Sequence, residues 1–324
     1  MSSKESKKIR LNSETDQCEN QNEEESERSA ESFQSLNSKL EDLPDEVILK
    51  VLSYLDTANL IRSGHVSQRL RAISSDESLW QKMNLFEKNV PTSFLQFVLE
   101  RGCKYLSLHS TKLNGSLNLT KPTKLEYLNI KSCLAEDKIL EKLLFSCRSL
   151  QKFAFSVHKY YSKSSFAASD MITSVCRQNK KTLKVLYLNI FHNWLNPGII
   201  KNVFFSCTEL KEVSIVGGYV GEDAINYLVK NLSPNVEKLR LDMQNITDKQ
   251  VKAIIKRCNK LTELILRSQT ITNETVTNII EHLPTLKKLN LMNSKIDCPT
   301  VLKFKRMPNL RVLNWDQELI SLLK

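Results

Sequence analysis

The residues of this chain whose types could do chemistry are its eight cysteines and five histidines. Such residues can build a zinc site, a disulfide framework or a catalytic thiol. Their spacing supports none of these, because no two cysteines are separated as C-x-x-C, and His158 and His192 have no ligand-type neighbour. Cys147, Cys207 and Cys258 instead each lie three residues before the opening leucine of a recurring pattern. We therefore expect no metal site and no disulfides, and we interpret the thiols as structural groups in a reducing compartment.

Other catalytic motifs are also missing from the sequence. The chain has no Gly-rich phosphate loop and no nucleophile elbow, and its Gly217-Gly218 pair falls in a loop between repeats. We therefore predict that the protein is not an enzyme, that it uses no cofactor, and that it acts by binding.

The elements that would position binding residues are indicated by a repeat. A triplet of apolar residues recurs with a step of 25 residues, each time in the order L-x-x-L-x-L, as in Val236, Leu239 and Leu241 and then Leu261, Leu264 and Leu266. That order and period are typical of a leucine-rich repeat, in which each unit is a strand, a loop and a helix. One unit cannot bury its apolar face alone, so the units must stack. The predicted fold class is an α/β leucine-rich-repeat solenoid, with parallel strands on the concave face and helices on the convex face.

The array extends in both directions from this stretch. A weaker first unit lies around Tyr105, and one step of 33 residues predicts an inserted loop around Tyr160 and Phe166. We assign residues 103–324 to about nine units. The opening residues of the triplets are Leu125, Leu150, Leu183, Leu210, Val236, Leu261, Leu286 and Leu310.

The segment before the repeats divides into three parts. Residues 1–38 lack a periodic apolar pattern and contain an acidic run, so we expect a disordered tail. Residues 39–85 predict three to four short helices, with Asp56 as one N-cap and Gly64 as one helix end. Residues 86–102 predict a linker helix. The short helices could cap the end of the solenoid, or they could use surplus apolar surface to bind a partner.

A resemblance to a known family favours the second interpretation. Residues 43–55 read Leu-Pro-Asp-Glu-Val-Ile-Leu-Lys-Val-Leu-Ser-Tyr-Leu and resemble the opening of an F-box. Residues 75–80, ending in Leu79-Trp80, resemble the closing segment of the branch associated with the S-phase kinase. Ser67 and Leu70 depart from the Cys and Trp that the family usually has. The order of an F-box and then cysteine-containing leucine-rich repeats resembles F-box/leucine-rich-repeat proteins across residues 40–316.

The resemblance implies a function and partners. Proteins of this family bind a Skp-family adaptor, which tethers them to a cullin scaffold, and their repeats hold a protein substrate for ubiquitination. By this analogy we expect the chain to be the substrate-recognition subunit of an SCF-type ubiquitin ligase. The alternative is a leucine-rich-repeat scaffold or inhibitor without a ligase role. The resemblance assigns the adaptor-binding surface to Leu43, Pro44, Ile48, Leu52, Leu55, Leu60, Val66 and Trp80.

Strand alternation identifies the candidate substrate-binding face. If the triplet leucines point inward, the residues between them line the concave face. Tyrosine and arginine are enriched at binding hot spots, which favours Tyr127, Tyr187, Arg240 and Arg267 among them. For any single one, a plain solvated strand residue is the alternative. The other members of this face are Tyr105, Ser107, Asn129, Lys131, Lys152, Asn189, Lys238, Asp242, Glu263, Lys288, Asn290 and Asp316.

The charge of the chain suggests the kind of substrate. The formal net charge is +11, and beyond the acidic tail 42 basic residues stand against 27 acidic ones. A basic surface favours an acidic or phosphorylated protein. Nucleic acid is disfavoured because Asp242 and Glu263 interrupt the basic residues. No apolar run is long enough to span a membrane, so we expect no membrane partner and a cytoplasmic or nuclear location.

Overall fold

The computed structural model describes residues 42–157, 165–190, 197–217, 220–315 and 318–321. It divides into two compact units, Met1–Leu79 and Trp80–Lys324. The predicted tail lies outside the described residues, and so does most of the predicted insertion around Tyr160. No helix in the described ranges has the length and apolar character to cross a membrane.

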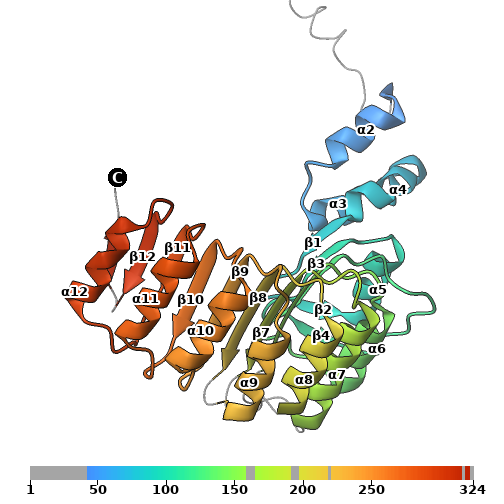
Figure 1. The fold of residues 1–324 in the computed structure, drawn as a ribbon. Helices are drawn as coiled ribbons and strands as arrows, with labels where there is room; N and C mark the ends of the chain where they lie inside the picture. Colours follow the sequence, from blue (N-terminus) through green and yellow to red (C-terminus); the bar gives the residue numbers. More distant parts are fainter. Residues whose placement is uncertain (1–41, 158–164, 191–196, 218–219, 316–317, 322–324) are drawn as a thin grey trace, which may run out of the picture. The chain divides into compact units, whose positions relative to one another are not determined.

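The first unit is built from short helices (Figure 1). These are α2 (Asp45–Leu52), α3 (Thr57–Ser63) and α4 (Gln68–Ser74), followed by the 3₁₀ helix η2 (Glu77–Trp80). The predicted cap is confirmed, because the Asp56 carboxylate accepts a hydrogen bond from the Asn59 backbone N–H at 2.7 Å. Gly64 is the C-cap of α3, also as predicted. The core of this unit consists of Ile48, Leu52, Leu60, Leu70 and Ile73.

The second unit is organised around a sheet of 11 strands in the order β1-β3-β5-β6-β7-β8-β9-β10-β11-β12-β13. Every pair of neighbours is parallel except β12 and β13. A parallel pair, β2 (Asn89–Pro91) and β4 (Lys112–Asn114), forms a second sheet. The strands of the large sheet are β1 (Lys82–Asn84), β3 (Tyr105–Ser107), β5 (Tyr127–Ile130), β6 (Lys152–Val157), β7 (Val185–Ile190), β8 (Glu212–Gly217), β9 (Lys238–Asp242), β10 (Glu263–Arg267), β11 (Lys288–Asn290), β12 (Val312–Trp315) and β13 (Glu318–Ser321).

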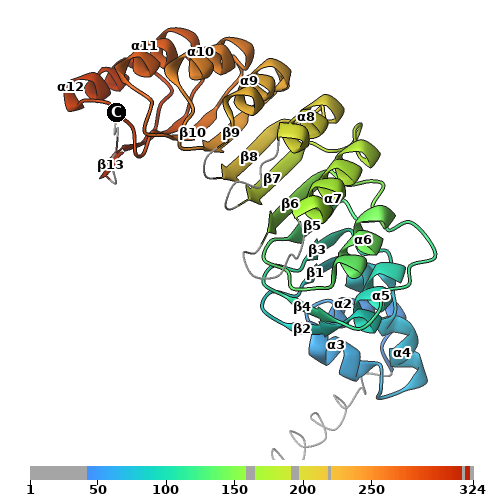
Figure 2. The same cartoon turned by 90° about the horizontal axis from the view of Figure 1, so that it is seen from below.

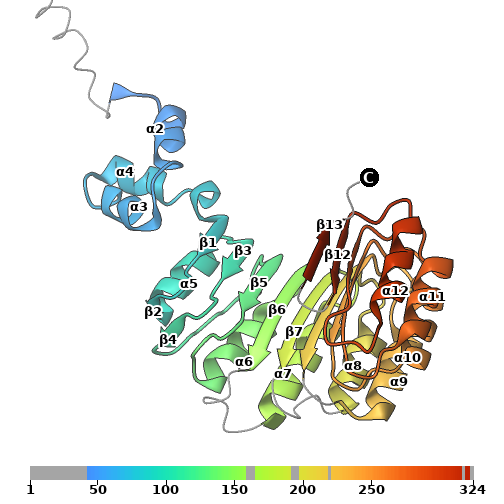
Figure 3. The same cartoon turned by 90° about the vertical axis from the view of Figure 1, so that its left-hand side faces the viewer.

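Helices cover one face of this sheet and leave the other open. In Figure 2 the helices follow the outer side of the curved sheet, and Figure 3 shows the same two layers from another side. Strand, loop and helix alternate along the chain, so the predicted leucine-rich-repeat fold is confirmed. The helices are α5 (Thr92–Glu100), α6 (Asp137–Ser146), α7 (Ser165–Gln178), α8 (Pro197–Ser206), α9 (Glu222–Asn231), α10 (Asp248–Arg257), α11 (Asn273–His282) and α12 (Cys298–Val301), which runs into the 3₁₀ helix η3 (Leu302–Arg306).

The recurring leucines and cysteines fill the space between the two layers. Leu239, Leu264 and Leu289 are register partners on β9, β10 and β11, and all three are buried. The thiols of Cys147 and Cys258 are buried at the ends of helices and donate to backbone carbonyls. Each repeat thus places the same residue type in the same environment, because stacking superimposes positions that are one period apart.

The sheet begins earlier in the chain than predicted. Strand β1 at Lys82–Asn84 pairs with β3, so the first strand of the large sheet lies inside the segment predicted to end at residue 85. The predicted linker helix corresponds to α5, which follows β2 directly. Trp80 packs edge-on against Phe97, with ring centroids 5.0 Å apart. Residues 80–102 therefore belong to the repeat unit, because their backbone and aromatic side chains complete its first layers.

Candidate functional site

The surface predicted to bind the adaptor is divided by burial. Ile48, Leu52 and Leu60 are at most 4% exposed in the core of the helical unit, and Trp80 is buried in the repeat unit. These four residues thus lie in the cores of the two units and not on their surfaces, and their role in adaptor binding stays a prediction. Leu55 and Val66 are exposed as that role requires, and so is Pro44, while Leu43 is half-buried.

A different apolar set occupies the surface of the helical unit. Helix α2 carries two apolar stripes with a spacing of four residues, and the stripe of Ile48 and Leu52 faces the core. The neighbouring stripe, Val47 and Val51, is more than 40% exposed on both residues. We call the exposed residues of this unit the apolar surface set: Val47, Val51, Tyr54, Leu55, Ile61 and Val66.

The start of α2 is held by Arg69 from helix α4. Its Nε donates to the Asp45 carboxylate at 2.9 Å, and its Nη2 donates to the Leu43 backbone carbonyl at 2.7 Å. Such contacts fix the stripe of Val47 and Val51 relative to α4. The arrangement presents apolar area on a held helix, which suits the binding of a partner protein.

The open face of the large sheet carries polar side chains in rows, because neighbouring strands are in register. The first row runs Lys82, Tyr105, Tyr127, Lys152, Val185, Glu212, Lys238, Glu263, Lys288 and Val312. The second row runs Ser107, Asn129, Ala154, Tyr187, Ser214, Arg240, Ile265, Asn290 and Asn314.

The four residues favoured by the sequence fall on these rows or beside them. Tyr127 is in the first row, and Tyr187 and Arg240 are in the second with Ser214 between them. Arg267 is one row further on, where its register partner is Asp242. The Arg267 guanidinium lies 3.3 Å from the Asp242 carboxylate, so its charge already has a partner.

Tyrosine rings and lysine side chains alternate over strands β3 to β7. Tyr105 and Tyr127 stack with centroids 4.0 Å apart. The Lys152 ammonium lies 5.5 Å from the Tyr127 centroid and 4.9 Å from that of Tyr187. The Lys131 ammonium is 5.0 Å from the Tyr187 centroid. Each distance is within the range in which an ammonium is attracted to an aromatic face.

The ionisable groups of this face perturb one another. Burial, with smaller contributions from Arg240 and Lys152, lowers the pKa of the Lys131 ammonium. Burial and the neighbouring Tyr105 raise the pKa of Tyr127 to about 12. Burial and the hydrogen bond to Glu212 raise the pKa of Tyr187, whose hydroxyl donates to that carboxylate. Lys131 thus lies in a partly dehydrated region that already has a positive potential.

A pocket of about 240 Å³ opens on the second row at Ser214. It exists because the short Ser214 side chain lies between the large side chains of Tyr187 and Arg240. We call it the Ser214 pocket. Its polar lining consists of Lys131, Tyr187, Glu212, Ser214, Lys238, Arg240 and Glu263. The sequence placed Lys131 and Lys238 on this face without favouring them, and Glu212 and Ser214 were not identified.

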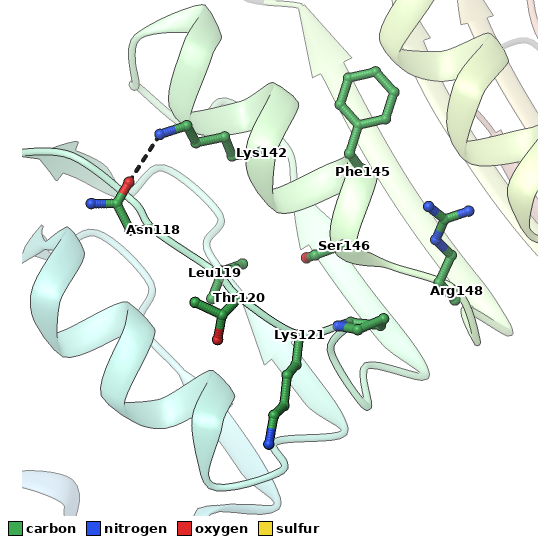
Figure 4. A pocket seen from close by; sticks show the side chains of 9 residues that line it. Asn118, Leu119, Thr120, Lys121, Lys142, Phe145, Ser146 and Arg148 are labelled. Carbon is green, nitrogen blue, oxygen red and sulfur yellow. Dashed lines mark hydrogen bonds between the residues drawn. The ribbon is translucent and has the colours of Figure 1, made fainter.

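A larger recess of about 450 Å³ lies elsewhere in the repeat unit, at the end of α6 (Figure 4). The Lys142 ammonium donates to the Asn118 amide oxygen there at 3.0 Å. Figure 4 shows the Phe145 and Arg148 side chains pointing away from that of Lys121, so the polar groups do not converge. The Ser214 pocket is the better candidate site, because Lys131, Arg240 and Ser214 line it together on the open face of the sheet.

Metal binding receives no support from the described part of the chain. Its His, Cys, Asp and Glu side chains form no group of three that could hold an ion. The cysteines described there are free thiols, and burial raises the pKa of Cys103 and Cys147 to about 11. A raised pKa keeps a thiol protonated at neutral pH, which suits a structural thiol better than a nucleophile or a ligand.

A segment made of the helical unit and the first residues of the repeat unit matches a known family. Residues 40–85 match the family described as F-box-like. This segment is an F-box-like domain. Over a stretch of 41 residues the chain is 49% identical to the probable E3 ubiquitin ligase complex SCF subunit sconB of Penicillium rubens. The corresponding proteins of Aspergillus niger and Arthroderma benhamiae are 44% and 46% identical over 41 residues. Each match covers 13% of this chain and 6% of the relative, so the chain spans only a small part of these relatives.

Two solved structures are similar to large parts of the chain. The complex of Rad7 and Elc1 from yeast matches 95% of this chain and 75% of that one, with 14% identity and a TM-score of 0.44. An internalin from Listeria monocytogenes matches 69% of each chain, with 15% identity and a TM-score of 0.38. The family match and the alternation of strand, loop and helix show that the chain combines an F-box-like domain with leucine-rich repeats.

Proposed function

We propose that this protein is the substrate-recognition subunit of an SCF-type ubiquitin ligase. In this role the F-box-like domain binds a Skp-family adaptor, and through it a cullin scaffold, while the open face of the repeats binds a protein substrate. The chain itself supplies no catalytic step. The transfer of ubiquitin would be the work of other subunits.

The observation that carries the proposal is the F-box-like domain and the apolar surface set on it. A domain of three short helices with six large apolar side chains exposed is expected to bury them against another protein. Residues 40–85 match the F-box-like family, and the chain is similar over 41 residues to probable SCF subunits. The repeat unit adds an open sheet face with aromatic and charged side chains, which are residue types that concentrate binding energy.

The proposal can be tested by co-purifying the full chain with a Skp-family adaptor. The matched variants are Val47→Ala/Val51→Ala, which shortens the exposed stripe of α2, and Phe205→Ala, which removes a large apolar side chain that is exposed on the repeat unit. We expect the first variant to bind the adaptor about tenfold or more weakly, because truncation of interface anchors commonly costs at least 1–2 kcal/mol. We expect Phe205→Ala to bind like the wild type.

Two results would count against the proposal. Unchanged capture by Val47→Ala/Val51→Ala would remove the apolar surface set as the adaptor site. No capture by a folded wild-type chain would favour the alternative, a leucine-rich-repeat scaffold or inhibitor without a ligase role. Recovery of the cullin in the same complex separates assembly of a ligase from binding of the adaptor alone.

A further inference from the structure

The Ser214 pocket contains a cation that has no carboxylate partner. Among the described residues, no carboxylate oxygen lies within ion-pair distance of the Lys131 ammonium, which instead lies over the Tyr187 ring. Lys152 also lies over the Tyr187 ring, whereas the lysines and arginines of β9 to β11 each lie near a carboxylate. Leaving a half-buried ammonium without a counter-charge costs free energy, which a bound anion would recover.

The carboxylates around the pocket already have partners. Glu212 accepts a hydrogen bond from the Tyr187 hydroxyl. Glu263 lies 3.2 Å from the Lys288 ammonium and 3.9 Å from that of Lys238. None of these carboxylates is therefore available to neutralise Lys131.

Arg240 contributes a second unsatisfied group. Its guanidinium is 3.6 Å from the Asp242 carboxylate, but its Nε is buried and has no hydrogen-bond partner. Asp242 is also shared with Arg267, so one carboxylate serves two guanidinium groups. Arg240 and Lys131 line the same pocket, with the Ser214 side chain between Arg240 and Tyr187.

We propose that the Ser214 pocket binds one anionic side chain of a partner protein, a phosphate monoester or a carboxylate, through Lys131, Arg240 and Ser214. The ammonium and the guanidinium supply charge-assisted hydrogen bonds, which are the stronger kind, and the serine hydroxyl supplies a neutral donor. The identification of that partner as a ligase substrate rests on the proposed function, whereas the binding of the anion does not.

The size of the pocket limits the ligand to the end of a side chain. A volume of about 240 Å³ lies below the several hundred cubic ångströms that pockets for small-molecule cofactors commonly have. Tyr187 forms one wall of the pocket, and the Glu212 carboxylate lies at the Tyr187 hydroxyl. Repulsion by Glu212 therefore favours a position of the ligand's anionic group near Lys131. A polymer of phosphates fits less well, because Glu212 and Glu263 alternate with lysines in the first row and would repel successive phosphates.

The test titrates the full chain with two tripeptides, Gly-phosphoserine-Gly and Gly-Glu-Gly, and with inorganic phosphate, at constant ionic strength. Binding is followed by the rise in melting temperature and by calorimetry. We expect saturable binding of at least one peptide, about tenfold weaker in Lys131→Gln because a charge-assisted hydrogen bond is lost. The matched control is Lys82→Gln, which removes a lysine of the same face that lies over the Tyr105 ring and does not line the pocket. Its affinity should stay within about twofold of the wild type.

A second variant tests the sign of the electrostatic effect. Glu212→Gln keeps an acceptor for the Tyr187 hydroxyl but removes a negative charge from the pocket, so anion affinity should rise. A purely structural role for Glu212 predicts no such gain. The relative affinity for the two peptides shows whether the anion is a phosphate or a carboxylate.

The proposal is overturned if folded wild-type protein binds neither the peptides nor phosphate, or if Lys131→Gln binds as well as the wild type. It is also overturned if single-stranded oligonucleotides bind tightly and Lys131→Gln and Lys82→Gln weaken that binding equally. Adaptor capture is measured on the same preparations. Loss of adaptor capture with intact anion binding would contradict the ligase role and leave the pocket assignment standing.

Discussion

The two units of this protein differ in how many of their large apolar side chains are exposed. Ten large apolar residues are exposed in the described chain, and six of them lie in the short helical unit. The much longer repeat unit accounts for the other four, Phe86, Phe145, Phe205 and Leu302. The helical unit thus leaves a large part of its apolar surface uncovered, while the repeats cover nearly all of theirs.

The difference follows from how each unit builds its core. A repeat buries its leucines against the preceding and following repeats, so a longer array covers more of its own apolar surface. Three short helices have no such neighbours, and α2 can turn only one of its two stripes toward α4. The repeat unit consequently offers mainly polar and charged side chains to a partner. The helical unit offers exposed apolar side chains instead.

The largest change in stability is expected from truncating a buried side chain in the repeat unit. Phe153 on β6 is fully buried, so Phe153→Ala should lower the free energy of unfolding by about 3–5 kcal/mol. Urea unfolding followed by circular dichroism measures the change. The control Phe205→Ala, at 75% exposure, should stay within about 0.5 kcal/mol. Equal losses in the two variants would mean that exposure does not separate core from surface here.

A neighbouring pair on α2 tests the two stripes of the helical unit. Leu52→Ala should destabilise this unit by about 2–5 kcal/mol, because it leaves a cavity in a small core. Val51→Ala, one residue away and 41% exposed, should change the stability little and weaken adaptor binding instead. Hydrogen exchange of the α2 and α4 amides measures the first effect. The reverse pattern would restore the surface predicted from the resemblance.

A buried polar bridge in the repeat unit ranks next. The Asn179 side chain accepts from the Leu150 N–H at 2.8 Å and donates to the Cys147 carbonyl at 3.1 Å. Asn179→Ala leaves the Leu150 N–H and the Cys147 carbonyl without these partners, so the free energy of unfolding should fall by about 1–3 kcal/mol. Asn309, whose exposed amide donates to Pro284, provides the control, and Asn309→Ala should cost much less. Chemical denaturation gives the free energy of unfolding of both variants, and equal losses would show that the buried bridge adds no stability.

The cap of α3 is a smaller local contribution. Asp56→Ala removes the acceptor for the Asn59 N–H and should destabilise the helical unit by about 1 kcal/mol. Asp56→Asn keeps an acceptor oxygen and should recover most of this loss. Thermal unfolding of the two variants gives the difference, and identical melting temperatures would show that the cap adds nothing.

The smallest effect at neutral pH comes from the buried thiols. Burial raises the pKa of Cys147 from 9.0 to about 11, so the folded state favours the protonated form. The resulting stability is fully present below pH 9.0 and is lost as the pH rises to about 11. At pH 8 the exposed Cys298 should be alkylated before Cys147 and Cys258, as mapped by mass spectrometry. Early alkylation of Cys147 in folded protein would contradict its burial.

Much of the repeat unit could be predicted from spacing alone. A period of 25 residues places Leu239, Leu264 and Leu289 at equivalent positions, and stacking then makes them register partners. The assignment of Tyr187 and Arg240 to one face followed from alternation along strands. Alternation gives no information about partners, however, and the pairing of Arg267 with Asp242 depends on the strand next to it.

The helical unit shows where prediction from the residues ends. Its helix period, its cap at Asp56 and its F-box resemblance are local properties, and a local pattern is enough to identify them. The sequence of α2 contains two apolar stripes of equal spacing, and neither is marked as the inner one. The packing of α2 against α4 decided that Ile48 and Leu52 are core and that Val47 and Val51 are surface.

The sequence by itself determined the repeat architecture, the inward leucines and cysteines and the F-box-like segment, because these depend on residue type and spacing along the chain. Only the tertiary structure decided which apolar stripe is exposed, which cations are already neutralised, and that Lys131, Ser214 and Arg240 line one pocket. Those outcomes depend on contacts between residues on different elements, such as Asp242 and Arg267, and the free energy of such contacts is set by burial and by neighbouring charges.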